Sequence, residues 1–142
     1  MSAGLSLEHL ARAEVVGLHE FFVAWFRSGG AAPDFGLCEG AFAPDFRMIA
    51  PEGDAHDRTA VMRRIREARG VLTSDFRIDI LGPRPVWMAD EAVLLEYVEQ
   101  QYRDGRSTRR RSTGLFTRCP SAPRGVQWLH LQETWMGAAA DT

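Results

Sequence analysis

The sequence contains no lysine, so arginine carries all 17 of its basic charges. Against 19 acidic residues this leaves a net charge of -2, which gives no electrostatic case for binding nucleic acid or anionic lipid. Cysteine is also scarce. Cys38 and Cys119 stand far apart and in no metal-like or redox-like spacing, so we expect two free thiols in a reducing cytosol.

No apolar run approaches the roughly 20 residues that a membrane-spanning helix needs. The N-terminus lacks the basic and apolar regions of a signal peptide, and we therefore predict a cytoplasmic protein. The chain has no glycine-rich phosphate loop and no nucleophile elbow. It also lacks repeats and linkers, and its length of 142 residues predicts a single domain over residues 1–142.

Three helices are predicted in the first half of the chain. The first, Leu5–Arg27, has apolar residues at three- and four-residue steps and Ser6 as its N-cap. A short second helix covers about residues 33–41, and a third, Arg58–Arg69, follows the N-cap Asp57. The third helix is rich in arginine, which we interpret as a solvated face rather than a nucleic-acid site. These arginines are Arg63, Arg64, Arg66 and Arg69.

From residue 75 onward the pattern predicts strand after strand. Asp104-Gly105 marks a hairpin turn, and Gly82–Pro85 marks a bend. These elements predict an α+β fold, in which three N-terminal helices pack on a strongly curved antiparallel sheet and leave a hollow between them. The predicted strands are Phe46–Ala50, Phe76–Ile80, Val86–Met88, Glu91–Tyr102, Ser107–Arg118 and Val126–Trp135.

The last predicted strand, VQWLHLQETW, alternates with a period of two. One face carries apolar bulk interrupted by a single carboxylate, that of Glu133. Burial of a carboxylate is costly, so we expect a site on this face. Its residues are Leu129, Leu131, Glu133 and Trp135, and those of the opposite face are Trp128, His130, Gln132 and Thr134.

Three segments carry a resemblance to a known family: AFAPDFRMIAPEG (Ala41–Gly53), RRSTGLFTR (Arg110–Arg118) and WLHLQETW (Trp128–Trp135). With the order of the elements, they resemble the nuclear-transport-factor-2-like superfamily, most of all its SnoaL-like and association-domain-like branch. The superfamily includes ketosteroid isomerase, polyketide cyclases, scytalone dehydratase and the association domain of calcium/calmodulin-dependent kinase. The resemblance implies a cone-shaped fold with an internal pocket, and a homodimer formed through the outer face of the sheet.

The resemblance also implies which side chains face the pocket. In relatives, a residue just before the closing Ser or Thr of the last strand does so, and here that residue is Glu133. A register error of one residue would exchange the inner and outer sets. The other inward residues are Leu129, Leu131, Trp135, Arg110, Ser112, Gly114, Phe116, Leu95, Tyr97 and Glu99. The outward residues are His130, Gln132, Thr113 and Arg111.

The chain departs from ketosteroid isomerases at two positions. Ala50 stands where their general-base aspartate precedes a Pro-x-Gly, and Phe22 replaces their oxyanion-hole tyrosine. Without a base and a donor at these positions, steroid-type isomerisation is not supported. The His and Asp pair with tyrosines that scytalone-dehydratase-type chemistry needs cannot be placed either.

The candidate catalytic residues are Glu99 and Glu133. Two carboxylates close together cannot both ionise cheaply, so one would have a raised pKa and could act as an acid or a base. Arg110 would instead neutralise them in a structural ion pair, or hold an anionic ligand. The candidate ligand-binding residues are Tyr97, Arg110, Phe116, Leu131, Trp135, Trp25 and Phe22.

Two functions remain open. The first is a homodimeric protein that binds a small, mostly apolar molecule, with isomerase-, cyclase- or dehydratase-type activity that needs no cofactor. The second is a non-catalytic dimerisation or protein-interaction module.

We predict no metal site, because the spacing of Asp54, His56 and Asp57 matches no tight site. His130 is interpreted as an interface residue.

Overall fold

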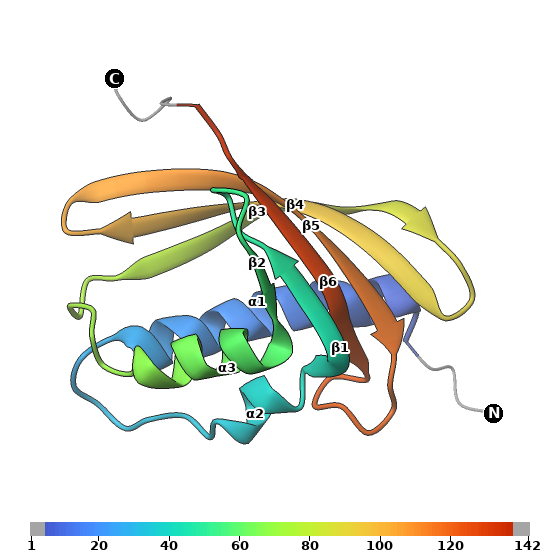
Figure 1. Ribbon diagram of the computed structural model, residues 1–142, viewed down its shortest axis with the longest axis horizontal. Coiled ribbons are helices and arrows are strands. Elements are labelled where there is room, and N and C mark those ends of the chain that lie inside the picture. The colour runs from blue at the N-terminus through green and yellow to red at the C-terminus, as the bar shows by residue number, and fades with distance from the viewer. Residues whose placement is uncertain (1–4, 138–142) are drawn as a thin grey trace.

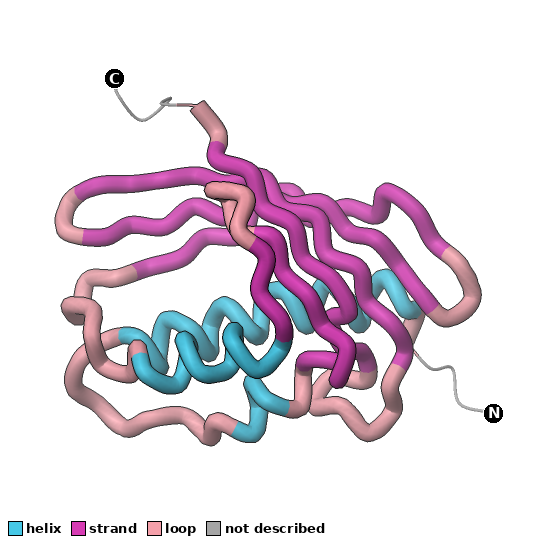
Figure 2. The backbone as a smooth tube through the Cα atoms, viewed as in Figure 1, coloured by secondary structure: helices cyan, strands magenta, loops and turns pink. Residues whose placement is uncertain are grey.

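The computed structural model describes residues 5–137, which form three helices on one face of a six-stranded sheet (Figure 1). The long helix α1 runs beneath the sheet, and α2 and α3 lie on the same side (Figure 2). This confirms the predicted α+β class. The helices are α1 (Leu7–Phe26), α2 (Gly36–Glu39) and α3 (Arg58–Glu67). The strands are β1 (Phe42–Ile49), β2 (Ala55–Asp57), β3 (Arg77–Met88), β4 (Ala92–Arg103), β5 (Arg106–Arg118) and β6 (Val126–Trp135).

The strands are hydrogen-bonded in the order β2-β1-β6-β5-β4-β3. Successive strands from β3 to β6 pair antiparallel, as short connections between neighbours require. β1 runs parallel to β6, so the prediction of a purely antiparallel sheet is wrong. These two strands lie far apart in the chain, and no hairpin fixes their relative direction. The edge strands β2 and β3 do not pair with each other, so the sheet is open. Its strong curvature into a cone stays a prediction.

The N-caps of α1 and α3 are those that the sequence predicts. The side chain of Ser6 accepts a hydrogen bond from the backbone N–H of His9 at 3.1 Å, and that of Asp57 accepts one from Ala60 at 2.9 Å. The second helix is one turn long, shorter than predicted. Asp34 accepts a hydrogen bond from the backbone N–H of Gly36 at 2.9 Å, which forms a turn before the helix rather than its first residues.

The strand bounds differ from prediction where the strands are irregular. β1 begins four residues earlier than expected, and its pairing with β6 shifts between Phe42 and Arg47. The three-residue strand β2 was not predicted. β3 is one strand whose pairing with β4 shifts at Leu81/Arg84, where the sequence predicts a bend, and Gly82 has a φ of 59° there.

The core lies between α1 and the inner face of the sheet. Ala11 and Val15 of α1 are completely buried, as are Val93 and Leu95 of β4. The indole N–H of Trp25 donates to a backbone carbonyl of α3 at 2.7 Å, which ties the two long helices together. Across residues 5–137, no helix has both the length and the apolar character that crossing a membrane would require.

Candidate functional site

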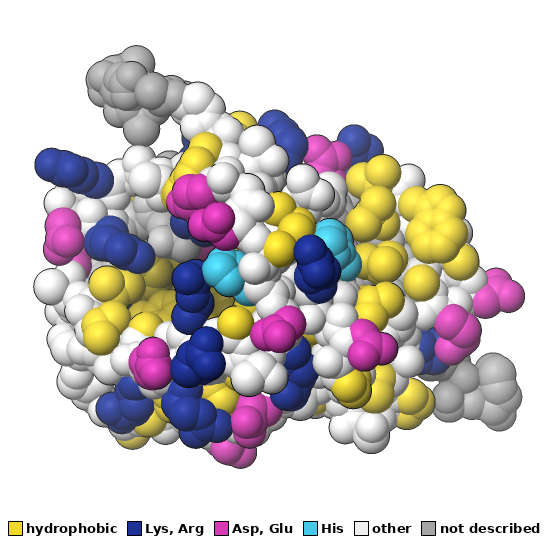
Figure 3. All heavy atoms as spheres, viewed as in Figure 1, with side chains coloured by type: hydrophobic (Ala, Val, Ile, Leu, Met, Phe, Trp, Pro, Cys, Tyr) yellow, Lys and Arg dark blue, Asp and Glu magenta, His cyan; other side chains and the backbone are white. Residues whose placement is uncertain are grey.

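A cavity of about 220 Å³ lies between α1, α3 and the inner face of the sheet. Figure 3 shows a hollow on this side of the molecule, with hydrophobic atoms on its floor and arginine side chains beside it. Most of the lining is apolar and comes from Leu18, Phe22, Phe26, Phe42, Phe46, Met48, Ala50, Val61, Ile65, Ile78, Trp128 and Leu131. The polar lining comes from His19, His56, Arg64, Glu99, Gln101, Arg110 and Glu133.

A β-bulge in β6 decides which of its residues reach the cavity. Phe116 pairs with Trp128 and Leu115 pairs with His130, so Leu129 is an extra residue without a partner in β5. Trp128 is 1% exposed and lines the cavity. The prediction that Leu129 faces inward and Trp128 outward is therefore wrong, because the bulge breaks the period-two alternation.

Beyond the bulge the predicted alternation is correct. Leu131 and Glu133 both line the cavity. Gly114 of β5 lies opposite Leu131, and a Cβ atom added there would stand 2.9 Å from the Trp128 ring. The strand therefore needs glycine at this position to let the indole approach closely.

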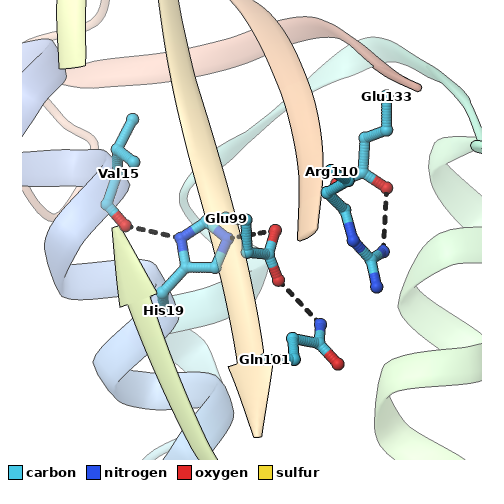
Figure 4. A network of polar contacts seen from close by, with 6 residues as sticks. All are labelled: Val15, His19, Glu99, Gln101, Arg110 and Glu133. Atoms are coloured by element: carbon cyan, nitrogen blue, oxygen red, sulfur yellow. Dashed lines mark hydrogen bonds and ion pairs between the residues drawn. The ribbon is translucent and has the colours of Figure 1, made fainter. Parts of the chain in front are cut away.

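Glu99 meets a partner that the sequence did not predict, His19 of α1 (Figure 4). His19 Nε2 lies 3.2 Å from Glu99 Oε1, and His19 Nδ1 lies 2.7 Å from the carbonyl oxygen of Val15. A carbonyl oxygen only accepts, so Nδ1 carries a proton. The other carboxylate oxygen of Glu99 accepts a hydrogen bond from Gln101 at 2.7 Å. His19 lies four residues after Val15 on the buried stripe of α1, which is the sequence signal that could have revealed it.

Glu133 pairs with Arg110 of the neighbouring strand. Arg110 Nη1 donates to Glu133 Oε1 at 3.2 Å, and the Arg110 guanidinium lies 4.6 Å from the centre of the Trp135 ring. Glu133 is 5% exposed and Glu99 is 3% exposed. The structure therefore brings the two predicted carboxylates to one wall of the cavity, each with its own cationic partner.

Burial and charge set different pKa values for the two carboxylates. Burial raises the pKa of Glu133, and the negative charge of Glu99 raises it further, to about 7 in spite of Arg110. Burial would also raise the pKa of Glu99, but the imidazolium of His19 outweighs it and lowers this pKa to about 2. Burial lowers the pKa of His19, yet the charge of Glu99 raises it overall. At neutral pH Glu99 and His19 form an ion pair, and Glu133 can give or take a proton.

Three of the predicted ligand-binding residues lie in the core and do not line the cavity. Tyr97 is 1% exposed beneath the rings of His19 and Trp128, and its hydroxyl has no hydrogen-bond partner among residues 5–137. Phe116 is completely buried against Trp128, at 4.4 Å between ring centres. Trp25 stacks on the ring of Phe21 and lies tilted against that of Phe35. Phe22 and Leu131 do line the cavity, whereas Trp135, 43% exposed, lines a second hollow beside it.

A third buried carboxylate, that of Glu14 in α1, was not predicted from the sequence. It is completely buried and accepts hydrogen bonds from the indole N–H of Trp128 at 3.0 Å and from Arg124 at 3.3 Å. Burial raises its pKa to about 7. Glu14 lines neither the cavity nor the second hollow.

The two positions at which the chain departs from ketosteroid isomerases both face the cavity. Ala50 and Phe22 belong to its lining, so neither supplies an ionisable group there. Within residues 5–137, no cluster of three or more His, Cys, Asp or Glu side chains is arranged to hold a metal ion.

A long helix beneath a mixed sheet, with a cavity between them, is the fold of nuclear-transport-factor-2-like proteins, which confirms the resemblance seen in the sequence. A nuclear-transport-factor-2-like protein of unknown function from Pseudomonas aeruginosa has a TM-score of 0.79 and 28% identity, over 90% of this chain and 99% of that chain. The CaMKII hub of S. rosetta has a TM-score of 0.69 and 12% identity, over 96% and 100%. A ketosteroid-isomerase-like protein from Parabacteroides distasonis has a TM-score of 0.62 and 11% identity, over 87% and 86%. No family model and no curated protein matches the sequence.

Proposed function

We propose that this protein binds a small, mostly apolar molecule in the cavity and moves one of its protons through Glu133. One observation carries the proposal: Glu133 lies on the wall of an apolar cavity, and its pKa is raised to about 7. A general acid or base works best when its pKa is near the working pH. The reaction class is isomerisation, cyclisation or dehydration without a cofactor, since each can begin with removal of a proton from carbon and end with delivery of a proton to another carbon, to an oxygen, or to a leaving hydroxyl that departs as water.

The polar side chains around Glu133 support this role because they keep the same charge when Glu133 gains or loses a proton. Glu99 and His19 neutralise each other, and Arg110 faces Glu133 across 3.2 Å. When Glu133 is ionised, the four groups carry two negative and two positive charges. Glu133 can therefore lose a proton without leaving an uncompensated charge in the cavity.

The test is native mass spectrometry of the purified protein, followed by denaturation. We expect a small molecule that denaturation releases. After incubation of the loaded protein in heavy water, the released molecule should carry a carbon-bound deuterium when it comes from wild type but not from Glu133→Gln. An empty cavity, or equal incorporation by the variant, contradicts the proposal.

We further propose that residues 1–142 form one domain and that it dimerises through the outer face of the sheet. Leu115 and His130 are register partners on that face and are half-buried in the single chain. The same face carries a shallow hollow of about 530 Å³, whose lining includes Arg111, Thr113 and Gln132.

The same dimer would form under the alternative function, in which the protein is a non-catalytic dimerisation module. The similarity to the CaMKII hub favours this alternative. Sedimentation of Leu115→Arg tests the dimer, with Val71→Arg as a control because Val71 is 62% exposed and lies off the sheet. We expect only Leu115→Arg to sediment as a monomer. A dimer that persists in both variants contradicts this interface.

A further inference from the structure

A second hollow of about 720 Å³ adjoins the cavity. The two share Met48, Ala50, Arg64, Gln101, Arg110 and Glu133 in their linings. A molecule seated in the cavity could therefore extend into the second hollow past Glu133. The cavity is mostly apolar, and the second hollow is lined largely by charged and polar side chains.

Arginine dominates the charge of the second hollow. Four arginines line it: Arg64 of α3, Arg103 of β4, and Arg106 and Arg110 of β5. Within residues 5–137, only Arg110 among them forms an ion pair, with Glu133. The Nε atom of Arg110 is buried without a hydrogen-bond partner in the same range, and an unpaired buried donor is costly.

The acidic residues of the second hollow do not cancel this charge. They are Glu52, Asp104 and Glu133, three against four arginines. Glu133 has a pKa of about 7 and is neutral part of the time. Glu52 already accepts a hydrogen bond from the indole N–H of Trp135 at 3.3 Å. The hollow therefore keeps an excess of positive charge.

Arg64 differs from the other arginines of α3 and from Arg69 in the turn that follows the helix. Arg66 pairs with Glu39 at 3.1 Å and lies over Phe35, and Arg69 lies over Trp25, so both are engaged on the outer surface. Arg63 lines neither hollow, whereas Arg64 lines both. All four arginines are exposed, as the predicted solvated face requires, and only Arg64 among them also lines the two hollows.

We propose that the second hollow binds an anionic oxygen group, a carboxylate or a phosphate, at the end of a ligand whose apolar part fills the cavity. Arg64 and Arg110 stand at the border between the two hollows. A guanidinium can bind either group through two parallel hydrogen bonds. The inference rests on the proposed function and adds the ligand class: an amphipathic anion.

The test compares octanoate with 1-octanol, which shares its apolar chain and lacks its charge. Isothermal titration calorimetry of the full chain measures both affinities, for wild type, Arg64→Gln and the matched control Arg63→Gln. We expect wild type to bind octanoate at least about tenfold more tightly than octanol. Arg64→Gln should weaken octanoate binding about tenfold and leave octanol unchanged, and Arg63→Gln should change neither. Octyl phosphate in place of octanoate shows which anion the hollow prefers.

Salt gives an independent readout. At about 1 M salt the Debye length is about 3 Å, so octanoate should lose its advantage over octanol. Equal affinities for octanoate and octanol, or equal effects of Arg64→Gln and Arg63→Gln, overturn the anion site. If octanol still binds in that case, the anion site is wrong but the proposed binding of an apolar molecule in the cavity still stands. Failure of all the ligands to bind contradicts both proposals.

Discussion

Glu14 and Glu133 are two buried carboxylates with the same raised pKa, about 7, and burial is the leading cause for both. Their surroundings differ. Glu14 is completely buried, and each of its oxygens accepts a hydrogen bond, from Trp128 and from Arg124. Glu133 lines the cavity, and only one of its oxygens accepts a hydrogen bond from a residue within 5–137. The raised pKa of these two carboxylates is therefore a consequence of burial and does not by itself indicate a catalytic role. What distinguishes Glu133 from Glu14 is that a molecule in the cavity can reach it.

The largest effect that separates the two is on stability. Glu14→Ala leaves the Trp128 indole and the Arg124 guanidinium without their acceptor, so we expect the free energy of unfolding to fall by about 3 kcal/mol. Glu133→Ala should cost less, about 1 to 2 kcal/mol, because it leaves one hydrogen-bond donor without its acceptor instead of two, and Arg110 still lies over the Trp135 ring. Urea denaturation of both variants measures the difference. Equal losses would show that the two carboxylates are structural in the same way.

The next effect is the pH dependence of stability. The pKa of Glu14 and that of Glu133 are both raised from 4.5 to about 7, so the folded state binds these protons more tightly than the unfolded state. Their contribution is fully present below pH 4.5 and is lost as the pH rises through 7. The raised pKa of His19 acts in the same direction above 6.5. Glu99, lowered to about 2, contributes stability that is lost only below pH 4.5.

Urea denaturation between pH 5 and pH 8 therefore should show a falling free energy of unfolding. Glu14→Gln and Glu133→Gln should each remove part of the slope, since glutamine does not titrate. A stability that rises over this range would contradict both raised pKa values.

The smallest effect concerns Gly17 in α1. A Cβ atom added there would overlap the Arg124 guanidinium, which binds Glu14, and would displace it. Alanine gains about 1 kcal/mol of helix propensity, but we expect Gly17→Ala to lose about 1 kcal/mol overall, because Glu14 loses a partner.

A double-mutant cycle isolates that loss. With Glu14→Ala already present, Arg124 has no buried partner to lose, and Gly17→Ala should become neutral or stabilising. The same loss in both backgrounds would show that Arg124 does not act through Glu14.

The local features of the fold were predictable from the sequence. Ser6 and Asp57 cap their helices, and Asp104-Gly105 forms the hairpin turn with both φ angles positive. Such signals lie within a few neighbouring residues. The placement of Glu99 and Glu133 on one cavity wall was predictable for a different reason, because the family resemblance set the register of their strands.

The features of the site that the sequence did not predict depend on contacts between residues far apart in the sequence. His19 and Glu99 stand 80 positions apart, and Glu14 and Trp128 stand 114 apart. The bulge at Leu129 adds one residue to β6, and no turn residue or glycine marks it within the strand. Because one extra residue exchanges the faces of a strand, Trp128 was assigned to the wrong side, while Glu133 beyond the bulge was assigned correctly.

The central claim is that Glu133 exchanges protons with the cavity near neutral pH. Carbon-13 NMR of the glutamate side-chain carboxyl groups tests it most directly, with Glu133→Gln and Glu14→Gln to assign the resonances and 1-octanol as the probe. We expect both carboxyl groups to titrate near pH 7, and only the pKa of Glu133 to rise when octanol fills the cavity. A Glu133 resonance that titrates below pH 5, or that octanol does not shift, would contradict the claim.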